Sequence, residues 1–227
     1  MICLVNNQFF AYKNFVLISA PGSGKGTFSQ YFVEKYGYAH ICPGDIFRNE
    51  INTHTELGKK IEPLTQNGEL VDEGIVCQIV ADNLSKAIQQ NKNFIIDGFP
   101  RTETAFTFLH KYLEAHNLTK EVCWMQFLAS DDTCIQRILG RQVCTNCFRI
   151  YNVTSAQSND KINCDGCGTK LIVRQADTEE SAKKRLQNFH AHTESLVNLA
   201  KKFYEFITIE TEHAFDDLKT YYNTLIK

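Results

Sequence analysis

The sequence predicts an α/β fold of the P-loop type, with three layers: a parallel five-stranded sheet covered by helices on both faces. Apolar runs of strand length alternate with segments of helical spacing along most of the chain. The first run, residues 15–18, leads into a glycine-rich turn and then a helix, which is the context of a phosphate-binding loop. Two segments, 42–71 and 140–177, interrupt the alternation and are candidate inserted lobes.

The remaining elements follow from the same patterns. Further strands are expected where apolar residues run together, at 38–41, 93–97, 122–128 and 206–209. Helices are expected at 27–36, 46–52, 57–67, 72–90, 102–116, 131–140, 177–203 and 214–226. Asp177, with Glu180 three residues later, resembles a capping box. We therefore expect Asp177 to cap the long helix that begins there.

Composition excludes several classes of partner. The 227 residues carry a net charge of −2, so no global basic field favours nucleic acid or an anionic membrane. No apolar run approaches the roughly 20 residues of a membrane span. Residues 1–14 have no charge before Lys13 and no clear cleavage site, so they make a poor signal peptide. We expect a cytoplasmic protein that binds neither nucleic acid nor membrane.

The turn at 19–27 reads SAPGSGKGT. Its glycines allow the backbone to wrap closely around phosphate oxygens, and Lys25 adds a point charge. The strict pattern GxxxxGK[ST] is not met, because Ser19 replaces its first glycine and Gly26 stands before the hydroxyl of Thr27. A glycine-rich turn that binds nothing is the alternative. The density of Gly, Pro, Lys and Thr between a strand and a helix favours phosphate binding.

Four of the nine cysteines form two CxxC pairs separated by sixteen residues: Cys144, Cys147, Cys164 and Cys167. This spacing is typical of a tetrahedral zinc site on two knuckle turns. Two disulfides or a redox pair are the alternatives, and neither suits a cytosolic chain. Between the first and last cysteine there are two basic and two acidic residues, whereas a ribbon that tracks phosphates should be basic. We therefore expect a structural zinc ion.

The motifs PGSGKGT (21–27), GDIFR (44–48), DGFPRT (97–102) and RILGR (137–141), with the two CxxC pairs, resemble those of the adenylate kinases. The resemblance is to the long form with a zinc-bearing lid, and it runs from about residue 15 to the C-terminus. Six of the seven arginines fall where that family places arginines around its two phosphate chains: Arg48, Arg101, Arg137, Arg141, Arg174 and Arg185.

The resemblance implies the reaction MgATP + AMP ⇌ 2 ADP, hence a role in adenine nucleotide homeostasis, and a monomer. It implies a core of residues 1–41, 72–139 and 178–227, an AMP-binding helical lobe at 42–71, and a zinc-bearing β lid at 140–177. Phosphoryl transfer needs positioning and charge neutralisation, and the acceptor oxygen is already ionised, so no general base is expected.

The resemblance also implies site residues. The catalytic residues it implies are Lys25, Arg101, Arg137, Arg174 and Arg185. The ATP-binding residues it implies are Gly22, Ser23, Gly24, Lys25, Gly26, Thr27, Arg137, Arg141, Ile150 and Tyr151. The AMP-binding residues it implies are Pro43, Arg48, Glu69, Leu70, Val71, Gly98, Phe99, Pro100, Arg101, Ala105, Arg174 and Arg185. Asp97 would order the hydration shell of Mg²⁺.

The chain departs from the family pattern at four positions. Ser19 replaces a P-loop glycine, and Pro43 replaces a threonine that usually touches AMP. Ala105 replaces the glutamine that usually reads adenine, and Ala176 replaces one of two adjacent aspartates, leaving Asp177. These departures leave two alternatives: a monophosphate kinase with a relaxed or different acceptor base, and a homologue that binds nucleotide without transferring phosphate. A third alternative, a P-loop ATPase switch whose zinc lobe binds a partner or nucleic acid, would have a basic ribbon and no second set of phosphate-binding arginines, and this sequence shows the opposite.

Overall fold

The structure, a computed structural model, describes residues 13–66, 69, 71–154, 157–212 and 222–223. Within them, five parallel strands form one sheet in the order β2-β3-β1-β4-β8. Their bounds are β1 Asn14–Leu17, β2 Ala39–Ile41, β3 Phe94–Asp97, β4 Val122–Leu128 and β8 Glu205–Glu210. The predicted parallel five-stranded sheet is confirmed.

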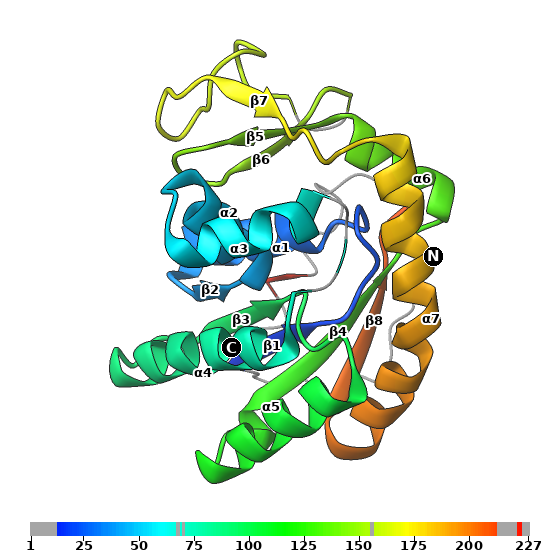
Figure 1. The fold of residues 1–227 in the computed structure, drawn as a ribbon. Helices are drawn as coiled ribbons and strands as arrows, with labels where there is room; N and C mark the ends of the chain where they lie inside the picture. Colours follow the sequence, from blue (N-terminus) through cyan, green and yellow to red (C-terminus); the bar gives the residue numbers. More distant parts are fainter. Residues whose placement is uncertain (1–12, 67–68, 70, 155–156, 213–221, 224–227) are drawn as a thin grey trace.

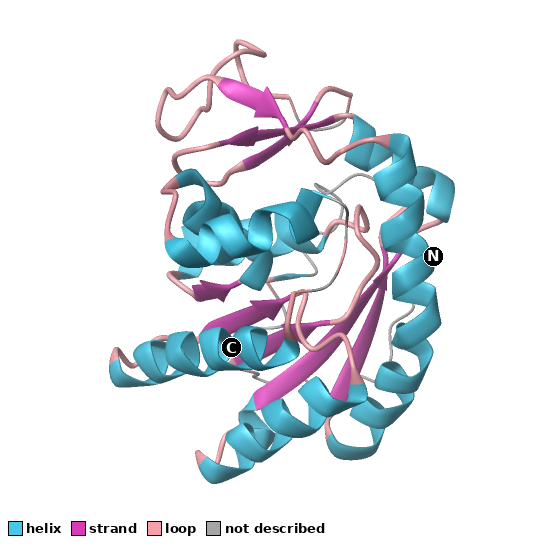
Figure 2. Cartoon of the chain, in the orientation of Figure 1, coloured by secondary structure: helices cyan, strands magenta, loops and turns pink. Residues whose placement is uncertain are grey.

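Both faces of the sheet are covered, which explains why its central strands read as continuous apolar runs. Successive side chains of a strand point to opposite faces. Phe15 and Leu17 of β1 accordingly pack in one cluster with Phe28 and Phe32 of the first helix. Val16 belongs to a second cluster, to which the helices on the other face contribute. The chain therefore forms three layers, as predicted (Figures 1 and 2).

Helices lie between successive strands of the parallel sheet. The described helices are α1 Lys25–Tyr36, α2 Pro43–Asn52, α3 Glu56–Gln66, α4 Glu73–Gln89, α5 Glu103–Ala115, α6 Asp131–Leu139 and α7 Glu179–Phe203, with a short 3₁₀ turn, η1 Thr119–Glu121. Of these, α2, α3 and α4 follow one another between β2 and β3. Side chains of α4, α5 and α7 build the second cluster, opposite α1. The helix expected at 214–226 lies outside the described residues, apart from 222–223.

Three expected helix starts are wrong. The first helix, α1, begins at Lys25 and not at 27. The helix after β2 begins at Pro43, not at 46, because proline suits the first helical position and Cys42 is the extended cap residue. The cap of α7 is Thr178, whose Oγ1 accepts a hydrogen bond of 3.2 Å from the backbone N–H of Ser181. Asp177 does not cap the helix, because its carboxylate faces two arginines.

A second sheet stands apart from the first, at the top of Figure 1. Its antiparallel strands are β5 Arg141–Cys144, β6 Ile150–Asn152 and β7 Leu171–Val173, in the order β6-β5-β7. This sheet falls within the segment 140–177, and α2 and α3 fall within 42–71. The division into core, AMP-binding lobe and lid remains a prediction.

Side chains of α1 contact the second sheet directly. The backbone N–H of Ile150 donates a hydrogen bond of 3.0 Å to Oε1 of Gln30, and Arg149 forms an ion pair of 2.8 Å with Glu34. Because α1 begins at the glycine-rich turn, these contacts bring the second sheet over that turn.

Candidate active site

One large pocket of about 980 Å³ lies between the glycine-rich turn, α2 and the second sheet. The turn follows β1, and Asp97 ends β3, so the pocket opens at the carboxyl ends of two adjacent parallel strands. Ligands of open α/β sheets bind at this edge. The fold therefore places the pocket where a nucleotide site is expected.

Backbone conformation or close contacts account for glycine at three positions of the turn. Gly22 and Gly24 have φ angles of +85° and +99°, in the left-handed region that favours glycine. A Cβ on Gly22 would lie 2.4 Å from the carbonyl oxygen of Cys134. A Cβ on Gly26 would lie 2.8 Å from Cδ1 of Ile150 in the second sheet. The bare backbone thus allows α6 and β6 to approach the turn.

Seven cationic side chains line the pocket: Lys25, Arg48, Arg101, Arg137, Arg141, Arg174 and Arg185. Among the described residues, Lys25, Arg101 and Arg174 have no carboxylate within ion-pair distance. Within the described part of the chain, Lys25 donates only to the carbonyl of Ala20, at 3.2 Å. Burial and the charges of Arg48 and Arg141 lower the pKa of Arg174 to about 9. Such concentrated positive charge calls for an anionic ligand.

Two buried carboxylates, Asp97 and Asp177, compensate part of this positive charge. Burial alone would raise the pKa of Asp97, but His40, Lys25 and Arg101 hold it below its ordinary value. Asp177, whose side chain is fully buried, accepts two hydrogen bonds of 2.8 and 2.7 Å from Arg141 and one of 3.1 Å from Arg185. It therefore joins β5 of the second sheet to α7.

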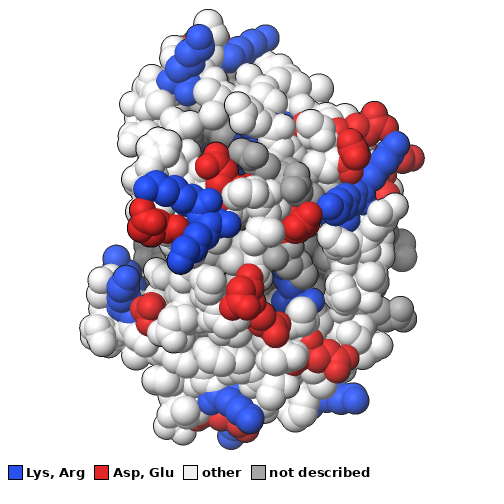
Figure 3. Space-filling model, viewed as in Figure 1, with Lys and Arg blue, Asp and Glu red and all other residues white. Residues whose placement is uncertain are grey.

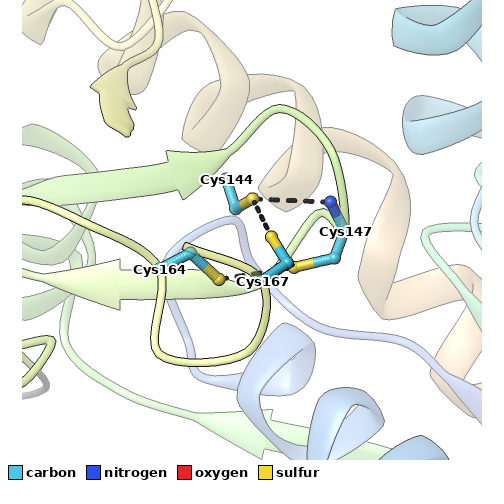
Figure 4. A group of neighbouring side chains, drawn as sticks. All are labelled: Cys144, Cys147, Cys164 and Cys167. Atoms are coloured by element: carbon cyan, nitrogen blue, oxygen red, sulfur yellow. Dashed lines mark hydrogen bonds between the residues drawn. The ribbon is translucent and has the colours of Figure 1, made fainter. Parts of the chain in front are cut away.

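The four cysteines of the two CxxC pairs converge at the end of β5 (Figure 4). Their sulfur atoms all lie within 4.8 Å of one another, with separations of 3.4 Å for Cys144–Cys167 and Cys147–Cys164. Four ligands about 2.3 Å from one zinc ion would lie about 3.8 Å apart. None of the four forms a disulfide. The cluster therefore fits a tetrahedral metal ion.

Charges of both signs mix on the surface. On the face drawn in Figure 3, Lys and Arg side chains lie among Asp and Glu, and the described residues there form no continuous basic track. None of the described helices has the length and apolar character to cross a membrane.

The adenylate kinase family model matches residues 17–205 of the chain. An adenylate kinase of Borreliella burgdorferi is 35% identical over 204 residues, which cover 90% of this chain and 93% of the relative. Those of Caldicellulosiruptor bescii and Acetivibrio thermocellus are 38% and 36% identical over 186 and 202 residues, covering 82% and 89% of this chain and 86% and 92% of the relatives.

The chain belongs to the adenylate kinase family. Membership confirms the resemblance drawn from the motifs, the P-loop fold class and the prediction of an enzyme that transfers phosphoryl groups between nucleotides. The alternatives of a P-loop switch and of another acceptor base are not favoured.

The pocket brings together most of the residues that the adenylate kinase motifs single out. Those on its wall are Gly22, Gly24, Lys25, Gly26, Thr27, Pro43, Arg48, Glu69, Val71, Asp97, Gly98, Phe99, Arg101, Ala105, Arg137, Arg141, Ile150, Tyr151, Arg174 and Arg185. The side chain of Ser23 is fully buried, and neither it nor Pro100 lines the pocket. Leu70 lies outside the described residues.

Two departures from the family pattern have a structural reason. Ser19 is buried, and its Oγ accepts a hydrogen bond of 2.7 Å from the backbone N–H of Phe127 in β4. Pro43 occupies the first position of α2, which suits proline. The carbonyl of Ala176 accepts a hydrogen bond of 2.9 Å from Arg185, but this backbone contact does not depend on the side chain and does not explain the replacement. Ala105 lines the pocket with a methyl group alone, and nothing in the structure explains that replacement.

Sequence reasoning missed residues that act through distant partners. Thr211 lines the pocket just beyond β8, its hydroxyl donates to the carbonyl of Ser23 at 2.8 Å, and its own carbonyl accepts from Arg137 at 2.6 Å. Because Thr211 closely follows a predicted parallel strand, the sequence could have placed it at the ligand-binding edge of the sheet. Gln30 and Glu34 carried no signal, because their contacts with the second sheet join residues more than 100 positions apart.

We expect Ser19→Ala to lower the free energy of unfolding by about 1–3 kcal/mol, because it leaves the buried N–H of Phe127 without an acceptor. Urea unfolding of both proteins measures the loss. Ser181→Ala is the matched control, because the buried Oγ of Ser181 has no hydrogen-bond partner among the described residues. Equal stability of Ser19→Ala and the unmodified protein would contradict the assigned role.

Proposed function

We propose that the chain transfers the terminal phosphoryl group of MgATP reversibly to AMP, giving two ADP. The observation that carries this proposal is the pairing, in one pocket, of a glycine-rich turn bearing Lys25 with separate arginines on α2, on the turn after β3 and beyond β7. One phosphate-binding set suffices for a nucleotide hydrolase. Two sets facing one space suit a reaction between two phosphate chains.

The residue roles follow from position and charge. The glycine-rich turn, with Lys25 and Thr27, holds the ATP phosphates, and Arg137 and Arg141 hold ATP from the side of α6 and β5. Arg48 and Arg101 hold the AMP phosphate. Arg174 and Arg185 neutralise the charge that develops on the transferring group. None of these groups moves a proton, because the attacking phosphate oxygen is already ionised.

Asp97 fits the role of a partner for hydrated Mg²⁺. Its Oδ1 is buried without a hydrogen-bond partner among the described residues, and its pKa is held below the ordinary value by His40, Lys25 and Arg101 against the opposing effect of burial. Hence the carboxylate is ionised and has an acceptor to offer. When bound with ATP near Asp97, the ion would help to neutralise the charge of the phosphates.

The four cysteines would hold one structural zinc ion, and their surroundings already suit thiolate ligands. The backbone N–H of Cys147 points at Sγ of Cys144 at 3.4 Å, and the hydroxyl of Tyr151 donates to Sγ of Cys164 at 3.5 Å. Donors of this kind orient and stabilise thiolate ligands. Since Tyr151 also lines the pocket, the metal site supports one wall of the active site. The monomeric state and the cytoplasmic location belong to the same proposal.

Lys25→Ala and Arg101→Ala should each lower turnover with ATP and AMP at least a hundredfold, which corresponds to about 3 kcal/mol of lost transition-state stabilisation. The measurement is ADP formation in a coupled assay at saturating substrate, with circular dichroism to verify folding. Lys13→Ala is the control, because the one contact of Lys13 with the described residues is an exposed ion pair with Glu121. Near-normal turnover of either variant would refute the assigned role.

Freshly isolated, reduced protein should contain one zinc per chain by elemental analysis. Chelation should lower the melting temperature and the activity, because the small second sheet depends on its metal for folding. Adding Zn²⁺ back, but not Mg²⁺, should restore both. Metal-free protein with full stability and activity would rule out a structural zinc ion.

AMP should be a substrate with a raised KM and with weaker rejection of GMP, CMP and UMP than a glutamine at position 105 would provide. A bidentate side-chain contact gives roughly 1–3 kcal/mol of discrimination between bases, and Ala105 offers none. The measurement is kcat/KM for the four monophosphates in the unmodified protein and in Ala105→Gln. Thr104→Gln is the matched control, because Thr104 does not line this pocket.

The alternative is that backbone near Val71 reads adenine instead. A preference for AMP above about a thousandfold that Ala105→Gln leaves unchanged would support this alternative and contradict the role assigned to the missing side chain.

A further inference from the structure

Three side chains with metal-binding atoms converge on one wall of the pocket, and no step of the proposed reaction uses them as ligands. They are His40 in β2, Cys42 directly after that strand, and Asp45 in the first turn of α2. One ring nitrogen of His40, Sγ of Cys42 and one carboxylate oxygen of Asp45 all lie within 4.8 Å of one another. Only Cys42 separates β2 from α2, and this tight connection fixes the three together.

The surroundings of His40 match those of a metal-binding imidazole. Its Nδ1 faces Oδ2 of Asp45 at 3.9 Å, and its Nε2 faces Oδ2 of Asp97 at 3.6 Å. A histidine that binds a metal through one ring nitrogen usually donates its other N–H to a carboxylate, which fixes the orientation of the ring. Asp97 occupies that supporting position, and its side chain is only 7% exposed.

We propose that His40, Cys42 and Asp45 form a second metal site, separate from the four cysteines, for a thiophilic divalent cation such as Zn²⁺ or Cd²⁺. Imidazole, thiolate and carboxylate are the ligands of such cations, whereas Mg²⁺ prefers oxygen ligands alone. As the metal–sulfur bond forms, the thiol of Cys42 releases its proton to solvent. With one thiolate instead of four, this site fills only when metal exceeds the capacity of the four cysteines.

Metal at this site inhibits phosphoryl transfer, a consequence that rests on the proposed function. Cys42 lies within electrostatic reach of Lys25, Arg48 and Arg101, the residues assigned to phosphate. A cation held there takes Asp45 from its ion pair with Arg48 and fills space between the phosphate-binding side chains. The metal site itself rests only on the three ligands and their geometry.

The decisive experiment uses ¹¹³Cd²⁺ as the probe, with two equivalents added to the full-length, reduced, metal-free protein. We expect a cadmium NMR resonance from a mixed nitrogen, sulfur and oxygen site, at a shift distinct from that of a four-thiolate site. Cys42→Ser and His40→Gln should each lose the mixed-ligand resonance. Cys77→Ser is the matched control and should keep it, because Cys77 is buried and does not line this pocket.

Absence of a mixed-ligand resonance, or its persistence in Cys42→Ser, would overturn the metal site. The outcome does not depend on the four cysteines, since their resonance has its own shift. A second measurement tests inhibition: the Zn²⁺ concentration that halves ADP formation should be at least tenfold higher in Cys42→Ser than in the unmodified protein or Cys77→Ser. Equal sensitivity would overturn the inhibitory role. Failure of all three proteins to form ADP would instead refute the proposed function, and the cadmium spectra would still decide the metal site.

Discussion

The structure depends on holding seven cationic side chains around one space with few carboxylates among them. Like charges at this density repel, and burying them adds a desolvation cost. Asp177 offsets part of it by accepting from both Arg141 and Arg185, and Asp45 pairs with Arg48. The positive charge that remains uncompensated favours an anionic ligand in the pocket.

The parallel sheet makes this arrangement possible. Its carboxyl edge brings the turn after β1, the end of β3 and the segment after β8 to one side of the molecule, although they are far apart in sequence. Apolar clusters on both faces hold that edge rigid. The second sheet and α2 then supply arginines from elements that are not part of the parallel sheet. The pocket is therefore built both by the ends of the parallel strands and by segments outside that sheet.

What the sequence could predict depends on the range of the interactions. The glycine-rich turn, the five strands and the paired cysteines carry local patterns, so their positions were predictable within about a residue. Asp177 was assigned wrongly as a helix cap because its ion pair with Arg141 spans 36 residues, and that tertiary contact outweighs the local capping pattern. Likewise, the presence of Ser19 is explained by a residue far away in sequence, because its Oγ accepts a hydrogen bond from the backbone N–H of Phe127 in β4. Local sequence contains no trace of such partners.

Contacts of residues 149 and 150 link the four cysteines to the glycine-rich turn. Arg149 pairs with Glu34 of α1 and also packs on the second knuckle turn, where a Cβ on Gly166 would lie 2.5 Å from its Nη1. Its neighbour Ile150 bonds to Gln30 and lies on bare Gly26. β6, which begins at Ile150 directly after Arg149, is short and belongs to a sheet of three strands. A sheet of this size has little core of its own, so a metal ion bound by the four cysteines would stabilise the geometry with which the sheet covers the glycine-rich turn.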